Sequence, residues 1–234
     1  MFDKLFVSAV IVAAGSSSRM RAGISKQLMT IGGKTVLQHT VSAFFTAEII
    51  DEIVVVCSEN EIESFKGLFS EENSVKPLVF TVGGSTRQQS VFNGVSATSK
   101  CADILAIHDG ARPLVTPSCI KSVVEDCVKF SASTLAVPVK DTIKVVKNGT
   151  VADTPDRGSL FAIQTPQVFR REMYLRAYER AAAEGKDYTD DCQLIESIGE
   201  SVHITLGDYT NIKITTIEDI AVAEAFLKTG GGVN

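Results

Sequence analysis

The sequence lacks the short motifs that mark several large classes of enzyme. It has no H-E-x-x-H pair, no G-x-S-x-G nucleophile turn and no serine accompanied by a plausible histidine base. It also has neither the G-x-G-x-x-G fingerprint of dinucleotide-binding sheets nor the G-x-x-x-x-G-K-[ST] phosphate loop. These absences argue against zinc peptidases and serine hydrolases. They also disfavour an NAD-dependent oxidoreductase, which we keep as the alternative from a different class.

Paired cysteines, long apolar stretches and excess positive charge are missing as well. The five cysteines are odd in number and form no C-x-x-C pair, so we expect small apolar core residues in a reducing compartment. The apolar run near the N-terminus is too short for a signal peptide or a membrane span. A formal net charge of -5 argues against bulk nucleic-acid binding. We therefore expect a cytoplasmic protein that binds neither nucleic acid nor membrane.

Short apolar runs alternate with helical patterns along the 234 residues, 44% of which are hydrophobic. Several of the runs are continuous in Val, Ile and Leu, as in parallel strands covered on both faces. The pattern predicts one α/β domain over 1–234 with three layers and a mostly parallel sheet. The predicted strands are Ala9–Val12, Ile53–Cys57, Leu78–Val82, Ile104–Ile107, Thr134–Val139 and Val202–Leu206.

Three helix starts carry recognisable capping signals. Thr35 with Gln38 predicts a capping box, and Thr116 followed by proline predicts an N-cap with proline at the first helical position. Thr216 precedes a final amphipathic helix with acids in its first turn.

Residues 139–169 break the α/β rhythm. Asn148 and Gly149 separate two β-rich runs, which predicts a hairpin. A hairpin inserted into an α/β sheet often projects as an arm, and we expect this one to pack on a second subunit.

The loop after the first predicted strand collects small residues and cations. Its sequence, from residue 10 to 27, is VIVAAGSSSRMRAGISKQ. Ala13, Ala14 and Gly15 let backbone N–H groups approach a ligand, while Arg19 and Lys26 add positive charge. The combination suits a polyphosphate, although solvated surface cations would give the same pattern.

The ends of two other predicted strands carry further candidates, because ligands of open α/β sheets bind outside the carboxyl ends of the strands. Gly83 and Gly84 precede a helix on which Arg87 and Ser90 lie one turn apart, so both are candidates to face a ligand; ordinary capping is the alternative. Asp109 follows a buried strand and is a natural outer ligand for a magnesium ion carried on phosphates.

Residues near these strand ends have plainer explanations. Gly110 and Arg112 come directly after Asp109, and His108 before it is best explained as a structural histidine because no second histidine lies at ligand spacing. Lys213, next to the final helix, would on its own be a solvated lysine on an edge strand. Together, the cations, glycines and aspartate indicate positioning and charge neutralisation, which is what nucleotidyl transfer requires.

Seven motifs occur in the order and spacing of one enzyme family. They are AAGSSSRM followed by SKQ, GGSTRQQSV, HDGARP, PVKDTIK, QTPQ, TDD and NIKITTIED. From about Ser8 to Leu227 the chain resembles the 2-C-methyl-D-erythritol 4-phosphate cytidylyltransferases of the non-mevalonate route to isoprenoids. The resemblance implies a Rossmann-like nucleotidyltransferase fold and the reaction of CTP with methylerythritol phosphate, with Mg²⁺ or another divalent cation carried on CTP.

The same resemblance implies roles for individual residues. Arg19, Lys26 and Lys213 would act on the α-phosphate and the leaving pyrophosphate. The nucleotide would be held by Ala13, Ala14, Gly15, Gly83, Ser90, Asp109, Gly110 and Arg112, with Asp109 the nearest candidate metal ligand. Methylerythritol phosphate would be held by Thr142, Arg157, Thr165 and Thr189. In the family the arm is exchanged within a homodimer, so Thr142 and Arg157 would serve the partner's site.

Two further hypotheses stay open on the sequence alone. Ribitol 5-phosphate cytidylyltransferases share the fold and the loop, and pocket residues do not separate the two substrates. A nucleotide-binding scaffold without catalysis is the other, although Arg19, Lys26, Asp109 and Lys213 together speak against it.

Overall fold

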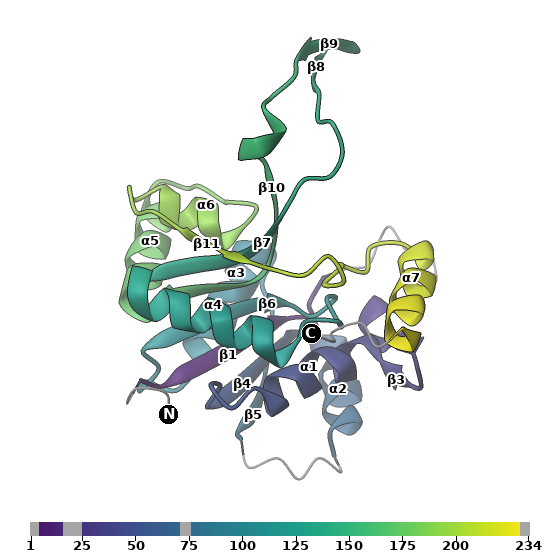
Figure 1. Cartoon of the computed structure of the whole chain (residues 1–234). Helices are drawn as coiled ribbons and strands as arrows, with labels where there is room; N and C mark the ends of the chain where they lie inside the picture. Colours follow the sequence, from purple (N-terminus) through teal and green to yellow (C-terminus); the bar gives the residue numbers. More distant parts are fainter. Residues whose placement is uncertain (1–4, 16–24, 71–75, 230–234) are drawn as a thin grey trace.

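A seven-stranded sheet forms the centre of the protein, shown in a computed structural model that describes residues 5–15, 25–70 and 76–229 (Figure 1). The strand order is β11-β7-β10-β6-β1-β4-β5, and every neighbouring pair is parallel except those of β10, which runs antiparallel to both β6 and β7. The strands are β1 (Val7–Val12), β4 (Glu52–Cys57), β5 (Leu78–Val82), β6 (Ile104–Asp109), β7 (Ala132–Pro138), β10 (Phe161–Arg170) and β11 (His203–Leu206). The prediction of a mostly parallel sheet is confirmed.

The continuous apolar runs become the inner strands because both of their faces are covered. Alternate residues of β1 point to opposite faces: Ile11 belongs to one apolar cluster and Val10 to another. Val10 is also in register with Val54 of β4 and Ile107 of β6. A strand buried on both faces has no polar side, which explains why these segments read as unbroken Val and Ile.

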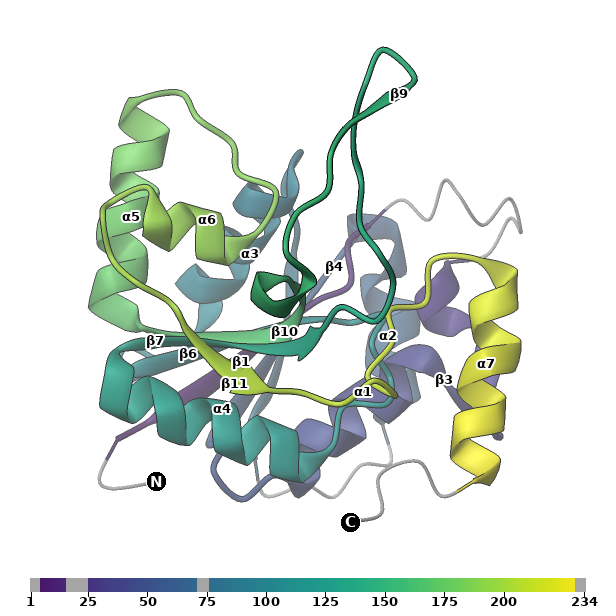
Figure 2. The same ribbon diagram turned by 45° about the horizontal axis from the view of Figure 1, so that its top comes forward.

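Helices cover both faces of the sheet, which gives the three layers expected (Figure 2). One face carries α1 (Val36–Thr46), α2 (Ile62–Leu68) and α4 (Pro117–Phe130). The other face carries α3 (Arg87–Ala97), α5 (Arg171–Ala183) and α6 (Asp191–Glu196). The final helix, α7 (Ile217–Lys228), packs instead on a small hairpin of β2 (Thr30–Ile31) and β3 (Lys34–Thr35).

The three predicted helix starts are confirmed. Thr35 and Gln38 form the reciprocal capping box of α1. The Thr116 hydroxyl accepts from the Cys119 amide at the start of α4, with proline at the first helical position. Thr216 caps α7 in a second capping box.

The predicted hairpin projects from the body of the molecule as an arm (Figure 1). Its tip is formed by β8 (Val145–Lys147) and β9 (Thr150–Asp153), joined through Asn148 and Gly149 with φ of 50° and 77°. These positive φ values belong to a type I′ turn, which the Asn-Gly pair favours. The projecting part is shorter than 139–169, because Gln164–Phe169 are buried in β10 within the central sheet.

Two expectations about single residues are wrong. Cys101 is exposed, while Cys57, Cys127 and Cys192 are buried as expected. Lys213 lies in the irregular segment between β11 and α7, not on a strand.

Candidate active site

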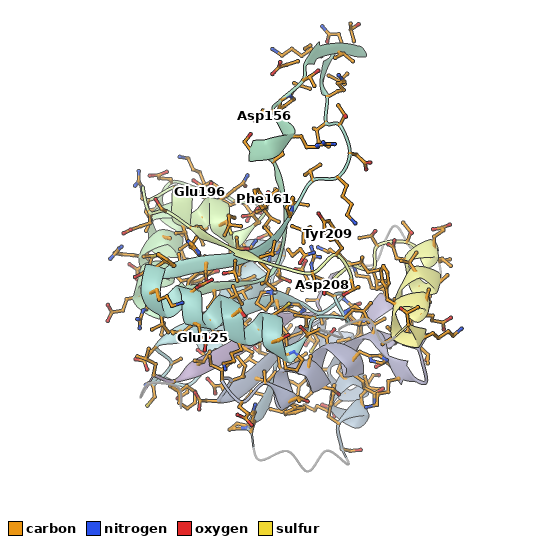
Figure 3. All side chains as sticks on the ribbon, in the orientation of Figure 1. Glu125, Asp156, Phe161, Glu196, Asp208 and Tyr209 are labelled. Carbon is orange, nitrogen blue, oxygen red and sulfur yellow. The ribbon has the colours of Figure 1, made fainter. Side chains whose placement is uncertain are left out.

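The candidate site residues gather at one edge of the sheet. Because β1, β4, β5 and β6 are parallel, their carboxyl ends meet there, and Ala13, Gly83 and Asp109 come together from distant parts of the sequence. The arm leaves β7 at this edge, and the segment that follows β11 crosses below it, where Asp208 and Tyr209 are labelled (Figure 3). Tyr209 ties the two together, since its hydroxyl donates to the Pro138 carbonyl at 2.8 Å.

The small residues at this edge are required by packing as well as by ligand approach. A Cβ on Gly83 would lie 2.6 Å from the Ala14 Cβ and 2.9 Å from the Ser90 Oγ. A Cβ on Gly110 would lie 3.1 Å from the Ala13 Cβ. The loops that leave β1, β5 and β6 therefore pack against one another at distances that larger side chains would not allow.

The Ser90 hydroxyl fixes the glycine loop. Its Oγ accepts from the Gly84 N–H at 3.0 Å and donates to the Thr86 carbonyl at 2.8 Å. Thr86 is itself the N-cap of α3. These bonds tie the backbone of the glycine loop to the first turn of α3.

Asp109 is the centre of a charged cluster at the end of β6. The Lys213 Nζ lies 2.7 Å from Asp109 Oδ2, and Arg87 Nη2 lies 3.6 Å from Oδ1. On its other side Arg87 meets the buried Asp191, with 2.8 Å between Nη1 and Oδ2. Burial alone would raise the pKa of Asp109, but Arg87 and Lys213 outweigh it and hold that pKa well below its usual range.

A buried asparagine anchors the segment that carries Lys213. The Asn211 amide donates to Gln164 Oε1 at 3.1 Å and to the Thr165 carbonyl at 3.0 Å, both on β10. The Asn211 carbonyl accepts from Arg112 Nη1 at 2.7 Å. These bonds tie the irregular segment to β10 and to the loop after β6.

The same segment brings two predicted catalytic lysines together. Lys26 donates from its Nζ to the Ile214 carbonyl at 3.1 Å, directly beside Lys213 in the chain. The Ile214 N–H in turn donates to the Ala111 carbonyl at 2.8 Å. Lys26, Lys213 and Asp109 therefore share one edge of the sheet; Arg19, the third predicted cation, lies outside the described residues.

Thr165 faces the interior of the protein. Its Oγ1 accepts from the Asp109 N–H and lies 3.0 Å from the Nδ1 of the buried His108. The His108 Nε2 lies 3.2 Å from the Arg112 carbonyl, which supports the structural role expected for this histidine. Thr165 thus shapes the end of β6 through its own hydrogen bonds.

Protonation of His108 should make the protein less stable in mild acid. Burial lowers its pKa to about 4 from the ordinary 6.5, so the unfolded chain takes up a proton before the folded protein does. Stability is full above about pH 6.5 and is lost as the pH falls toward 4, by about 2 kcal/mol between pH 7 and 5. Asp109 adds to the loss only below about pH 4, near the ordinary pKa of aspartate.

Urea titrations at pH 7 and pH 5 measure this effect. His108→Gln should show a smaller difference between the two pH values than the unsubstituted protein. His203→Gln is the matched control, because its ring is partly exposed on β11. An unchanged pH difference in His108→Gln would contradict the assignment.

The remaining predicted residues lie on the arm and at the start of α6. Thr142 and Arg157 are exposed on the arm, where the Arg157 Nη1 donates to the Lys140 carbonyl at 3.1 Å. The neighbouring Asp156 is labelled on the projecting part, well above the sheet (Figure 3). Thr189 donates to Gln193 Oε1 at the start of α6. The arm thus carries its two residues away from the sheet edge of its own chain.

The donor set suits a cation that arrives on a nucleotide. Within the described residues no three His, Cys, Asp or Glu side chains group as metal ligands. Asp109 offers one carboxylate at the edge, and Lys213 and Arg87 flank it. Mg²⁺ commonly takes one or two protein carboxylates and completes its shell with substrate phosphates and water.

One ion pair was not anticipated from the sequence. Arg87, a candidate to face a ligand together with Ser90, lies between Asp109 and Asp191. Asp191 belongs to the TDD motif, of which the resemblance gives a role to Thr189 alone. The signal available was its charge at the start of a helix, which ordinary capping also explains.

A doubly covered, mostly parallel sheet, small residues directly after β1 and lysines gathered at the carboxyl edge are typical of a nucleotidyltransferase. The family model for 2-C-methyl-D-erythritol 4-phosphate cytidylyltransferase matches residues 7–229, and the chain belongs to this family.

Known proteins of this family are similar to this chain in both sequence and structure. A 2-C-methyl-D-erythritol 4-phosphate cytidylyltransferase from Caldanaerobacter subterraneus subsp. tengcongensis is 47% identical over 95% of this chain and 99% of its own. The crystal structure of 4-diphosphocytidyl-2C-methyl-D-erythritol synthase from Anaerococcus prevotii superposes with a TM-score of 0.87 at 32% identity, covering 97% of each chain. The cytidylyltransferase from Thermus thermophilus gives a TM-score of 0.78 at 29% identity, covering 96% of this chain and all of that one.

In the part of the chain that the structure describes, every helix is too short or too polar to cross a membrane.

Proposed function

We propose that the protein transfers the cytidylyl group of CTP to 2-C-methyl-D-erythritol 4-phosphate and releases pyrophosphate. Family membership over residues 7–229 sets the reaction. The observation that carries the assignment to residues is the meeting of Lys26 and Lys213 beside Asp109, at the carboxyl edge of the sheet. A site of this kind brings two polyanions together.

The reaction needs little covalent help from the protein. A phosphate oxygen of the second substrate attacks the α-phosphorus of CTP in line, the bond to the β-phosphate bridging oxygen breaks, and pyrophosphate leaves. The nucleophile is already an anion, so no general base is required. Arg19, Lys26 and Lys213 stabilise the charge that builds on the α-phosphate and on the leaving group.

The nucleotide lies over the loops that leave β1, β5 and β6. Backbone groups of Ala13, Ala14 and Gly15 face the triphosphate, a position supported by their small size. Gly83 and Ser90 read the cytosine from the fixed glycine loop. Asp109, Gly110 and Arg112 line the ribose end of the nucleotide.

A divalent cation, Mg²⁺ in the simplest case, accompanies CTP. Asp109 is the protein group that would contact it, and the ion would neutralise charge on the phosphates. The flanking cations Arg87 and Lys213 keep the Asp109 carboxylate ionised for this purpose.

The second substrate is held by residues of two subunits in a homodimer. Thr165 and Thr189 belong to the same chain as the lysines, and Thr142 and Arg157 come from the arm of the partner. Exposed apolar side chains along the arm support a partner contact: Ile143, Val145, Val146 and Val151. A cytoplasmic location, with five free cysteines, is part of the same proposal.

Pyrophosphate release tests the substrate assignment. CTP and Mg²⁺ are combined with either methylerythritol 4-phosphate or ribitol 5-phosphate, and pyrophosphate is measured in parallel. Release with methylerythritol phosphate is expected. Release with ribitol phosphate alone would keep the chemistry and overturn the substrate, and silence with both would overturn catalysis.

A further inference from the structure

Asp109 is shared by two cations of different mobility. Arg87 has a side chain that is 26% exposed and is enclosed by two carboxylates, whereas the Lys213 side chain is 37% exposed and meets Asp109 alone among the described carboxylates. Lys213 is therefore the cation that can leave Asp109.

Arg87 is held in place from behind by Asp191. The Asp191 side chain is 2% exposed, and its Oδ2 lies 2.8 Å from Arg87 Nη1. The Asp191 N–H donates to Gln167 Oε1 at 3.0 Å, and the Tyr174 hydroxyl lies 3.5 Å from Oδ1. The Gln167 contact, from β10, holds the Asp191 backbone, and the Tyr174 contact, from α5, is made to the carboxylate that pairs with Arg87.

The two ion pairs have different consequences for catalysis. In the proposed mechanism Lys213 must contact the α-phosphate, yet in the free protein it is 2.7 Å from Asp109. If Lys213 were the only counter-ion, its departure before the divalent cation reached Asp109 would leave a buried, unpaired carboxylate, which is strongly unfavourable. Arg87 remains beside Asp109 when Lys213 moves, so the carboxylate stays compensated.

We propose that Arg87, anchored by Asp191, is the permanent counter-ion of Asp109 that lets Lys213 exchange Asp109 for the α-phosphate of CTP. Arg87 and Asp191 are thus positioning residues, which act through Lys213 without touching the reacting atoms. The inference rests on the proposed role of Lys213.

The test neutralises the anchor without stranding a buried charge. Arg87→Gln combined with Asp191→Asn removes both partners, so neither remains as an unpaired ion. The matched control is Arg176→Gln with Glu200→Gln, an exposed ion pair of 2.9 Å on the surface. Both pairs of substitutions are also made in an Asp109→Asn background, in which no carboxylate needs a counter-ion.

Turnover is measured as the rate of pyrophosphate release, and slow variants are assayed at high enzyme concentration. The affinity for CTP is measured by calorimetry in the absence of the second substrate. The Arg87/Asp191 double variant should lose about tenfold or more in kcat and bind CTP more weakly. In the Asp109→Asn background the same change should cost less than about threefold, because the two positions act together. The surface control should change neither quantity in either background.

A purely structural role predicts a different result. Equal losses with and without the Asp109 carboxylate, or no loss at all, would overturn the proposal. Arg87→Lys keeps the positive charge and should retain most of the turnover, so it provides the test if the double variant fails to fold. If Arg87→Lys loses as much turnover as a folded Arg87→Gln variant, the proposal is overturned. Normal turnover in Lys213→Ala would overturn the proposed role of Lys213 itself. If Lys213→Ala loses turnover but the Arg87/Asp191 double variant does not, only the counter-ion role of Arg87 is overturned.

Discussion

Replacing Lys213 with alanine should lower kcat by about 100-fold or more, the scale found for preorganised groups that stabilise transition-state charge. Lys213 lies beside Asp109 and next to the residue whose carbonyl accepts from Lys26, so it is placed to reach a phosphate at this edge. Lys26→Ala should fall in the same range. The measurement is pyrophosphate release at saturating CTP and methylerythritol phosphate.

A folding defect is separated from a catalytic one by a control lysine. Lys121→Ala removes an exposed side chain on α4 whose ion pair with Glu125 spans 3.8 Å, and it should leave turnover and melting temperature unchanged. Lys213→Ala should melt close to the parent protein, because Arg87 continues to pair with Asp109. Near-normal kcat in Lys213→Ala would refute its assignment as a catalytic cation.

Mixing two inactive variants should restore activity if the arm serves the partner's site. Lys213→Ala damages the site on the body of its own chain, and Arg157→Ala damages the site that its arm enters. In a mixed dimer one site then carries both defects and the other carries none. Statistical mixing gives half mixed dimers, so about a quarter of wild-type activity should return.

The alternative geometry gives no recovery. If each arm served its own chain, every site in a mixed dimer would carry one defect. The mixture would then stay as inactive as its components. Co-expression with two affinity tags isolates the mixed dimer, and two variants of the same body site, Lys26→Ala and Lys213→Ala, form the control pair that should never recover.

Most of the fold follows from local signals in the sequence. Unbroken apolar runs predicted β1 and β4, and the Thr35 capping box predicted the first residue of α1, because these patterns act over a few neighbouring residues. The Asn-Gly turn of the arm followed in the same way. The antiparallel position of β10 between β6 and β7 could not be predicted in this way, because it depends on how the chain returns from the arm to the sheet.

The sequence indicated which residues form the candidate site, but not which of them contact one another. Asp109 and Lys213 come from opposite halves of the chain, and their 2.7 Å contact arises only when the segment after β11 crosses the sheet edge. Arg87 pairs with Asp191 for the same kind of reason. Ion pairs between residues this far apart in the sequence leave no short motif. The charged residues could therefore be recognised as candidates from the sequence, but their partners could not.

Strand β1 lies inside the sheet, between β6 and β4, and both of its neighbours come from distant parts of the sequence. Val10 pairs on one side with Val54 and on the other with Ile107, so β1 waits for distant segments before either side is covered. Such non-local pairings slow folding, because each must close a long loop first. Lys213 follows all seven strands of this sheet in the sequence, so the edge proposed to bind phosphate depends on a segment that comes after every strand.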